Sequence, residues 1–156
     1  MDHNGYLDHR DMIVVASALG ARLGLSGQDA QRVSDAYERV WQYAVRHIGT
    51  DAEGRISRRS YIDYALAPGR DRAEFVANVV RPITDALWDA LDADGDERLD
   101  RAEFLLLWSA YDVAGAASRA SFERLRGKKV AHVSKDGFAQ AMYDFYYGSA
   151  AAPILG

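Results

Sequence analysis

An acidic run between residues 92 and 103 has the residue types and spacing of a site for a hard metal cation. Counting residue 92 as the first of twelve, oxygen-bearing side chains occupy positions 1, 3, 5, 9 and 12. Calcium binds six to eight oxygens at about 2.3–2.6 Å, and alternate residues of a tight turn direct short carboxylates at one ion. We therefore predict a calcium site at which position 7 contributes only its backbone carbonyl. The predicted ligands are Asp92, Asp94, Asp96, Arg98, Asp100 and Glu103.

Position 6 of this loop is Glu97, where the turn of such a loop requires a positive φ. A non-glycine residue in that conformation costs on the order of 1 kcal/mol. We expect the neighbouring Gly95 to relax part of this strain, so that Glu97 weakens the affinity and leaves the site in place.

Apolar residues flank the loop at the spacing of two amphipathic helices that share one core. The alternative interpretation is a solvated acidic turn in which Asp100 and Glu103 only cap a helix. An apolar residue at position 8, together with both helix faces, favours the metal site. The apolar positions are Leu87, Trp88, Leu91, Leu99, Phe104, Leu107, Trp108 and Tyr111.

Composition restricts the class of protein. The chain has 156 residues, 49% of them hydrophobic, a net charge of −4 and a pI near 5.5, which argues against binding nucleic acid through its phosphates. It has no cysteine and no apolar run long enough for a membrane span, and it starts with polar residues. These features predict a cytoplasmic protein, and the abundance of alanine and arginine is compatible with a bacterial source.

An apolar residue followed by a polar residue and a helical pattern recurs four times along the chain. These loops resemble those of paired EF-hands, a resemblance that implies a short antiparallel bridge between the apolar residues at position 8 of two loops. We predict that Leu7 pairs with Ile56 and that Leu99 pairs with Val133.

Two of the four loops lack the end ligands. The second loop runs from Gly49 to Ser60 and keeps only Asp51 and Glu53 at positions 3 and 5. The fourth loop would run from residue 126 to residue 137, and it has arginine at position 1 and glycine at position 12. We predict that neither loop holds calcium and that both serve as packing partners.

The first loop is incomplete, because its position 1 would precede Met1 and its entering helix is missing. Two interpretations stay open, a weak calcium loop or a frayed terminus. We favour the absence of tight binding. The residues in question are Asp2, Asn4, Asp8 and Asp11.

The remaining chain predicts helices over residues 8–23 and 26–48, and no strands beyond the loop bridges. Pro68 and Gly69 interrupt the pattern between the two halves, so we predict domains at 1–69 and 70–156. Pro82 lies inside a helical pattern and should kink or restart that helix.

Enzymatic motifs are not evident. The sequence has no His-Glu-x-x-His pattern and no phosphate-binding glycine loop, and Glu38 is most simply part of a solvated helix face. We therefore predict a protein that is not an enzyme. The histidines are scattered, at His3, His9, His47 and His132.

The loop at residues 92–103, the four apolar positions and the aromatic segment Tyr143–Tyr147 resemble the EF-hand superfamily, and most closely sarcoplasmic calcium-binding proteins and their bacterial relatives of the calerythrin type. The resemblance implies an all-α fold of two EF-hand pairs, in which some hands are silent and the apolar tail Ala152–Gly156 folds back on the core. This chain departs from that pattern at Glu97 and in lacking the first helix.

The resemblance also implies a calcium-binding function, either as an intracellular buffer or signal modulator, or as a sensor that exposes a surface to an unknown protein partner. Sensors that open use flexible methionine-rich grooves. This chain has only Met1, Met12 and Met142, which favours the buffer or modulator.

Overall fold

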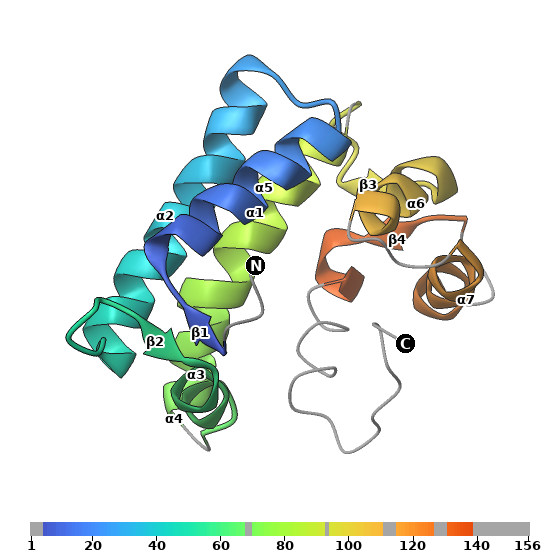
Figure 1. Cartoon of the computed structure of the whole chain (residues 1–156). Coiled ribbons are helices and arrows are strands. Elements are labelled where there is room, and N and C mark those ends of the chain that lie inside the picture. The colour runs from blue at the N-terminus through green and yellow to red at the C-terminus, as the bar shows by residue number, and fades with distance from the viewer. Residues whose placement is uncertain (1–4, 68–69, 93, 111–114, 127–130, 139–156) are drawn as a thin grey trace. The chain divides into compact units, whose positions relative to one another are not determined.

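The computed structural model describes residues 5–67, 70–92, 94–110, 115–126 and 131–138. This part of the chain is mostly helical, and its only strands form two antiparallel bridges (Figure 1). The predicted all-α fold with short bridges between loops is confirmed. The elements are β1 (Tyr6–Leu7), α1 (His9–Arg22), α2 (Gly27–Ile48), β2 (Ile56–Ser57), α3 (Arg58–Ala65), α4 (Arg70–Phe75), the π-helix η1 (Val76–Val80), α5 (Arg81–Leu91), β3 (Arg98–Leu99), α6 (Arg101–Ala110), α7 (Gly115–Arg126) and β4 (Val133–Ser134).

Both predicted loop pairings are confirmed. In the bridge between β1 and β2, Leu7 is opposite Ile56, and in the bridge between β3 and β4, Leu99 is opposite Val133. Ile56, Leu99 and Val133 are each at most 1% exposed, so the bridges connect the loops to the cores beneath them. The apolar requirement at position 8 therefore has a packing cause.

The structure divides into two compact units, Met1–Ala86 and Leu87–Gly156. The first unit extends beyond the boundary predicted at residue 69, because the segment after it packs back onto the preceding helices. Phe75 is buried, and its ring lies 5.8 Å from that of Tyr61 and 6.2 Å from that of Tyr64. The predicted chain break at Pro68 and Gly69 lies outside the described residues.

Helices α1 and α2 begin and end close to the predicted positions. Asp8 caps α1 by accepting the N–H of Asp11 at 3.0 Å, and Asp11 accepts the N–H of Asp8 at 3.2 Å. Helix α2 follows Ser26 and ends at Ile48, and Gly49 caps it with a φ of +82° that suits glycine. The buried residues of the two helices include Met12, Ala16, Leu19, Val33, Ala36, Tyr37, Val40 and Ala44.

Pro82 does not end its helix, and the helix instead changes type before it. Proline has no N–H, and its ring clashes with the carbonyl four residues earlier, which here is that of Asn78 in η1. A wider π turn accommodates such a disruption. Thr84 adds a side-chain hydrogen bond to the carbonyl of Val80 at 2.9 Å. The predicted restart at Pro82 thus takes the form of η1 followed by α5.

The second unit has a mainly aromatic core around Phe104. The Phe104 ring lies 5.3–6.5 Å from the rings of Phe122, Trp108 and Phe138. The predicted apolar faces on both sides of the loop at residues 92–103 are buried, except that Tyr111 lies outside the described residues. Among the helices that the structure describes, none has both the length and the apolar character needed to cross a membrane.

Candidate metal centre

Three of the predicted ligands form one cluster. Asp92 directly follows α5, and its N–H continues the helix by donating to the carbonyl of Trp88 at 2.9 Å. From Asp92, Asp94 and Asp96, one carboxylate oxygen each lies within 4.8 Å of the others. Asp92 is half-buried and the other two are exposed, so the cluster faces solvent above the buried end of α5. An ion can reach it without unfolding the loop.

Backbone N–H groups hold this cluster in shape. Asp92 accepts the N–H of Asp96 at 3.0 Å through Oδ1 and that of Glu97 at 2.9 Å through Oδ2. Asp94 accepts the N–H of Asp96 at 3.2 Å. Each ionised carboxylate has about four acceptor sites, so these bonds leave room for metal coordination. The donor set is that of a hard divalent cation such as calcium.

No basic side chain in the described part of the chain forms an ion pair with Asp92, Asp94 or Asp96. Lys135 of the fourth loop instead pairs with Asp89 at 3.1 Å. The negative charge of the cluster is therefore compensated only by backbone dipoles and solvent, which favours the binding of a cation from solution.

The predicted strain at position 6 is present. Glu97 has φ +58° and is the one described non-glycine residue with a positive φ. Gly95 also has a positive φ, of +70°. Gly95 therefore meets a separate requirement of the turn at position 4, and the expectation that it relaxes the strain at Glu97 is not supported by the backbone.

The last two carboxylates lie at the start of α6. Asp100 Oδ1 accepts the N–H of Ala102 at 2.7 Å and of Glu103 at 2.9 Å, and Glu103 Oε2 accepts the N–H of Asp100 at 2.9 Å. This reciprocal pair is a capping box. The helix-capping alternative is thus realised at these two residues, beside the cluster formed by the other three. Arg98, whose carbonyl is the remaining predicted ligand, is exposed in β3.

The other loops use positions 9 and 12 for capping as well. Asp8 and Asp11 form the capping box of α1, while Asp2 and Asn4 lie outside the described residues. Ser57 caps α3 by accepting the N–H of Ser60 at 3.0 Å. In the fourth loop, Ser134 accepts the N–H of Gly137 at 3.1 Å. Capping by positions 9 and 12 is therefore common to all four units and does not by itself indicate a metal.

The remaining features of the fourth loop agree with a packing role. Arg126 at position 1 forms an ion pair with Glu123 of the same helix, and hydrogen bonding to Arg126 lowers the pKa of the Glu123 carboxyl. Lys128 and Val130 at positions 3 and 5 lie outside the described residues, as do Met142, Phe145, Tyr143–Tyr147 and the tail Ala152–Gly156.

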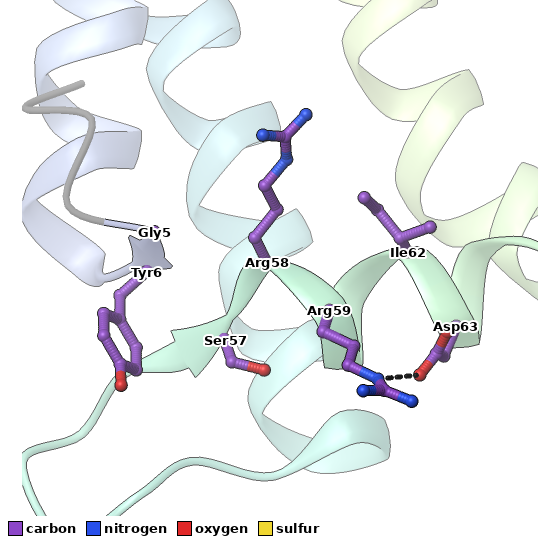
Figure 2. A pocket seen from close by; sticks show the side chains of 7 residues that line it. All are labelled: Gly5, Tyr6, Ser57, Arg58, Arg59, Ile62 and Asp63. Carbon is purple, nitrogen blue, oxygen red and sulfur yellow. Dashed lines mark ion pairs between the residues drawn. The ribbon is translucent and has the colours of Figure 1, made fainter.

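A surface pocket of about 490 Å³ lies in the first unit. Figure 2 shows its lining, with Tyr6 and Ser57 at the bridge and Arg59 paired with Asp63 on α3. None of the six predicted calcium ligands lines it. A carboxylate site on a loop surface needs no deep cavity, so the pocket does not mark the metal centre.

Two contacts in the first unit were not predicted from the sequence. His9 and Glu38 lie 2.6 Å apart, and both side chains stay exposed, so Glu38 lies on a solvated helix face as predicted but also has a partner on the neighbouring helix. Arg55 of the second loop pairs with Asp51 at 2.9 Å and with Glu53 at 3.1 Å. The spacing of arginine four residues after Asp51 and two after Glu53 was a signal for the second contact.

Comparison with known proteins gives consistent results for the fold. No protein-family model matches the chain. Calerythrin of Saccharopolyspora erythraea is 22% identical over 160 residues, which cover 99% of this chain and 89% of that protein.

Solved structures agree over nearly the whole length. One is a Streptomyces coelicolor calcium-binding protein that acts in prokaryotic calcium-mediated regulation. It superposes with a TM-score of 0.76 and 24% identity, covering 96% of this chain and 91% of that one. Calcium-loaded apo-aequorin from Aequorea victoria gives a TM-score of 0.73 and 18% identity, covering 97% and 86%. The resemblance predicted from the sequence is therefore confirmed, and this chain shares the fold of these calcium-binding proteins.

Proposed function

We propose that this protein binds one calcium ion tightly, in the loop between α5 and α6. The observation that carries the proposal is that the carboxylates of three alternate residues converge at positions 1, 3 and 5, with no basic partner among the described residues. The proposed ligands are the side chains at positions 1, 3, 5, 9 and 12 and the carbonyl at position 7. They are Asp92, Asp94, Asp96, Asp100, Glu103 and Arg98.

Charge explains why a cation would order this loop. Its twelve residues contain six carboxylates and two arginines, and the carboxylates repel one another at close range. A bound divalent cation would remove that repulsion. Because the loop lies on the buried ends of α5 and α6, calcium binding is expected to stabilise the second unit through mass action on the folded state.

Relatives support calcium as the ion. The Streptomyces coelicolor protein is a calcium-binding protein, and the Aequorea victoria structure is a calcium-loaded form. The second loop of this chain lacks ligands at both ends, and the fourth has arginine at position 1, so we assign neither of them a calcium ion.

Within this role we propose a buffer or signal modulator. The aromatic side chains next to the loop fill the core, because Trp88, Phe104 and Trp108 are all at most 4% exposed. Met12 is also buried, and it is the only methionine among the described residues. A protein of this kind would bind calcium with a modest change of surface.

The alternative is a calcium sensor with a protein target. Leu106 on α6 is 43% exposed, so one apolar side chain on the helix that leaves the loop already faces solvent. A dye that fluoresces on apolar surfaces distinguishes the two roles. A large calcium-dependent increase in its emission supports a sensor, and an unchanged emission supports the buffer or modulator.

A matched pair of variants tests the assignment of the loop. Asp94→Asn and Asp51→Asn both remove the charge at position 3, one in the proposed calcium loop and one in the second loop. We expect Asp94→Asn to weaken calcium binding at least tenfold in a calorimetric titration and Asp51→Asn to leave it unchanged. The opposite pattern would move the site to the first unit.

A further inference from the structure

The second loop contains a positive charge at the place where its carboxylates converge. The Arg55 guanidinium donates from Nε at 3.1 Å and from Nη2 at 2.9 Å to Asp51 Oδ2, and from Nη2 at 3.1 Å to Glu53 Oε2. Asp51 and Glu53 are at positions 3 and 5 of their loop, as Asp94 and Asp96 are in the third loop. The same two positions thus face a guanidinium in one loop and no basic group among the described residues in the other.

The backbone of the second loop is closed around the same aspartate. Asp51 Oδ1 accepts the N–H of Glu53 at 3.0 Å and that of Arg55 at 2.8 Å, and the N–H of Asp51 donates to the carbonyl of Arg55 at 2.9 Å. The hydrogen bond from the backbone of Arg55 is the main cause that holds the pKa of Asp51 below its ordinary value. The carboxylate is therefore kept ionised in a fixed orientation.

Arg55 also reaches the first loop. Its guanidinium carbon lies 4.3 Å from the centre of the Tyr6 ring, and Tyr6 is opposite Ser57 in the bridge between the two loops. A guanidinium over an aromatic face is attracted by the ring. One side chain thus connects both carboxylates of the second loop to the strand of the first.

We propose that Arg55 is an internal cation that holds the N-terminal loop pair closed in the absence of metal. The end of α2 agrees with this role, because Gly49 at position 1 has φ +82° and ψ 166°. Aspartate and glutamate rarely adopt this backbone conformation, so it disfavours a carboxylate ligand at position 1. The N-terminal pair is then a fixed structural element, and calcium dependence is confined to the second unit.

The first test is thermal unfolding in excess chelator of Arg55→Gln, with Arg59→Gln as the matched control. Arg59 has the same charge and pairs with Asp63 (Figure 2). That pair is 91% and 70% exposed, whereas Arg55 and Asp51 are 34% and 32% exposed. We expect Arg55→Gln to lower the melting temperature by about 2 °C or more and Arg59→Gln to leave it unchanged. Equal melting temperatures for Arg55→Gln and the natural chain would overturn the proposal.

The second test asks whether a metal can replace the guanidinium. In a Glu103→Gln background, which disables the proposed third-loop site, amide NMR resonances of residues 53 and 55 are followed during addition of calcium to millimolar concentration. We expect them to stay fixed while Arg55 is present and to shift in Arg55→Gln. Destabilisation without such a shift would show an ordinary ion pair and overturn the internal-cation role. If Arg55→Gln does not fold, Arg55→Lys is used in its place. Its melting temperature must then lie below that of the natural chain, and an equal melting temperature would overturn the proposal.

Discussion

Glu97 donates its backbone N–H to Asp92 Oδ2 at 2.9 Å while it adopts a left-handed conformation with φ +58°. The hydrogen bond that holds Asp92, the first proposed ligand, thus comes from Glu97, whose backbone conformation is strained. Glycine is the residue that tolerates such a conformation without a side-chain clash. The proposed calcium loop is therefore built with a local energetic cost.

Replacing Glu97 with glycine should relieve that cost. The strain is on the order of 1 kcal/mol, so Glu97→Gly is expected to tighten calcium binding by up to about fivefold in a calorimetric titration. Glycine also adds freedom to the unfolded chain, which lowers the stability of the fold and not the calcium affinity of the folded loop. Gly95→Ala is the control of opposite sign, since Gly95 has φ +70° and open space around it. If Glu97→Gly weakened binding, the strain argument would be wrong.

Glu103→Gln should weaken calcium binding at least tenfold, about 1.4 kcal/mol or more, because an amide supplies calcium with less charge than a carboxylate. The amide oxygen still accepts the N–H of Asp100, so the start of α6 should be retained. Circular dichroism of the calcium-free variant checks that the helices are intact. An intact variant with unchanged affinity would exclude Glu103 as a ligand.

The predictable part of the structure followed from local rules. The sequence places an apolar residue at the same position of each loop, and the resemblance to paired EF-hands implied the bridges that join Leu7 to Ile56 and Leu99 to Val133. The clustering of alternate carboxylates followed from the tightness of the turn.

The unpredicted part depends on side-chain orientation in three dimensions. Whether Arg55 folds back on Asp51 or points to solvent depends on Tyr6, which is 49 residues away in the chain. The pair of His9 and Glu38 likewise joins two helices. The position of the unit boundary depends on how Phe75 packs against α3. The turn residues Pro68 and Gly69 pointed to an earlier boundary and gave no information on that packing.

Calcium should change tryptophan emission through the second unit. Trp88 precedes the loop and Trp108 lies on α6, so both are near the elements that tighten around an ion, whereas Trp41 stacks with His9 in the first unit at 6.0 Å. Calcium at about a hundred times its Kd should also stabilise the fold by about 2.7 kcal/mol, visible as a higher melting temperature. Magnesium should act less, because it prefers octahedral geometry and retains its waters.

The control for this experiment is the double variant Trp88→Phe, Trp108→Phe. A calcium-dependent change of emission that persisted in full in this variant would have to come from Trp41. Binding would then occur in the first unit, contrary to the assignment.

Acid should weaken the contact between α1 and α2. Hydrogen bonding to His9, followed by that to Gln42, lowers the pKa of the Glu38 carboxyl below its ordinary value of 4.5. A carboxyl with a depressed folded-state pKa contributes stability above its unfolded pKa, and that contribution is lost as the pH falls through the folded value. The difference in melting temperature between the natural chain and Glu38→Gln should therefore be present at about pH 5.5 and shrink below about pH 4.5. A difference that grew on acidification would contradict this.

The most direct test of the account is the number of calcium ions bound by the natural chain, measured by isothermal titration calorimetry after removal of metal with a chelator. We predict one tight site per chain, located at Asp92–Glu103, because no other loop has carboxylates at positions 1, 3, 5 and 12. Two or more sites of similar affinity would show that the first or second loop was misassigned. A titration without tight binding would contradict the proposed function itself.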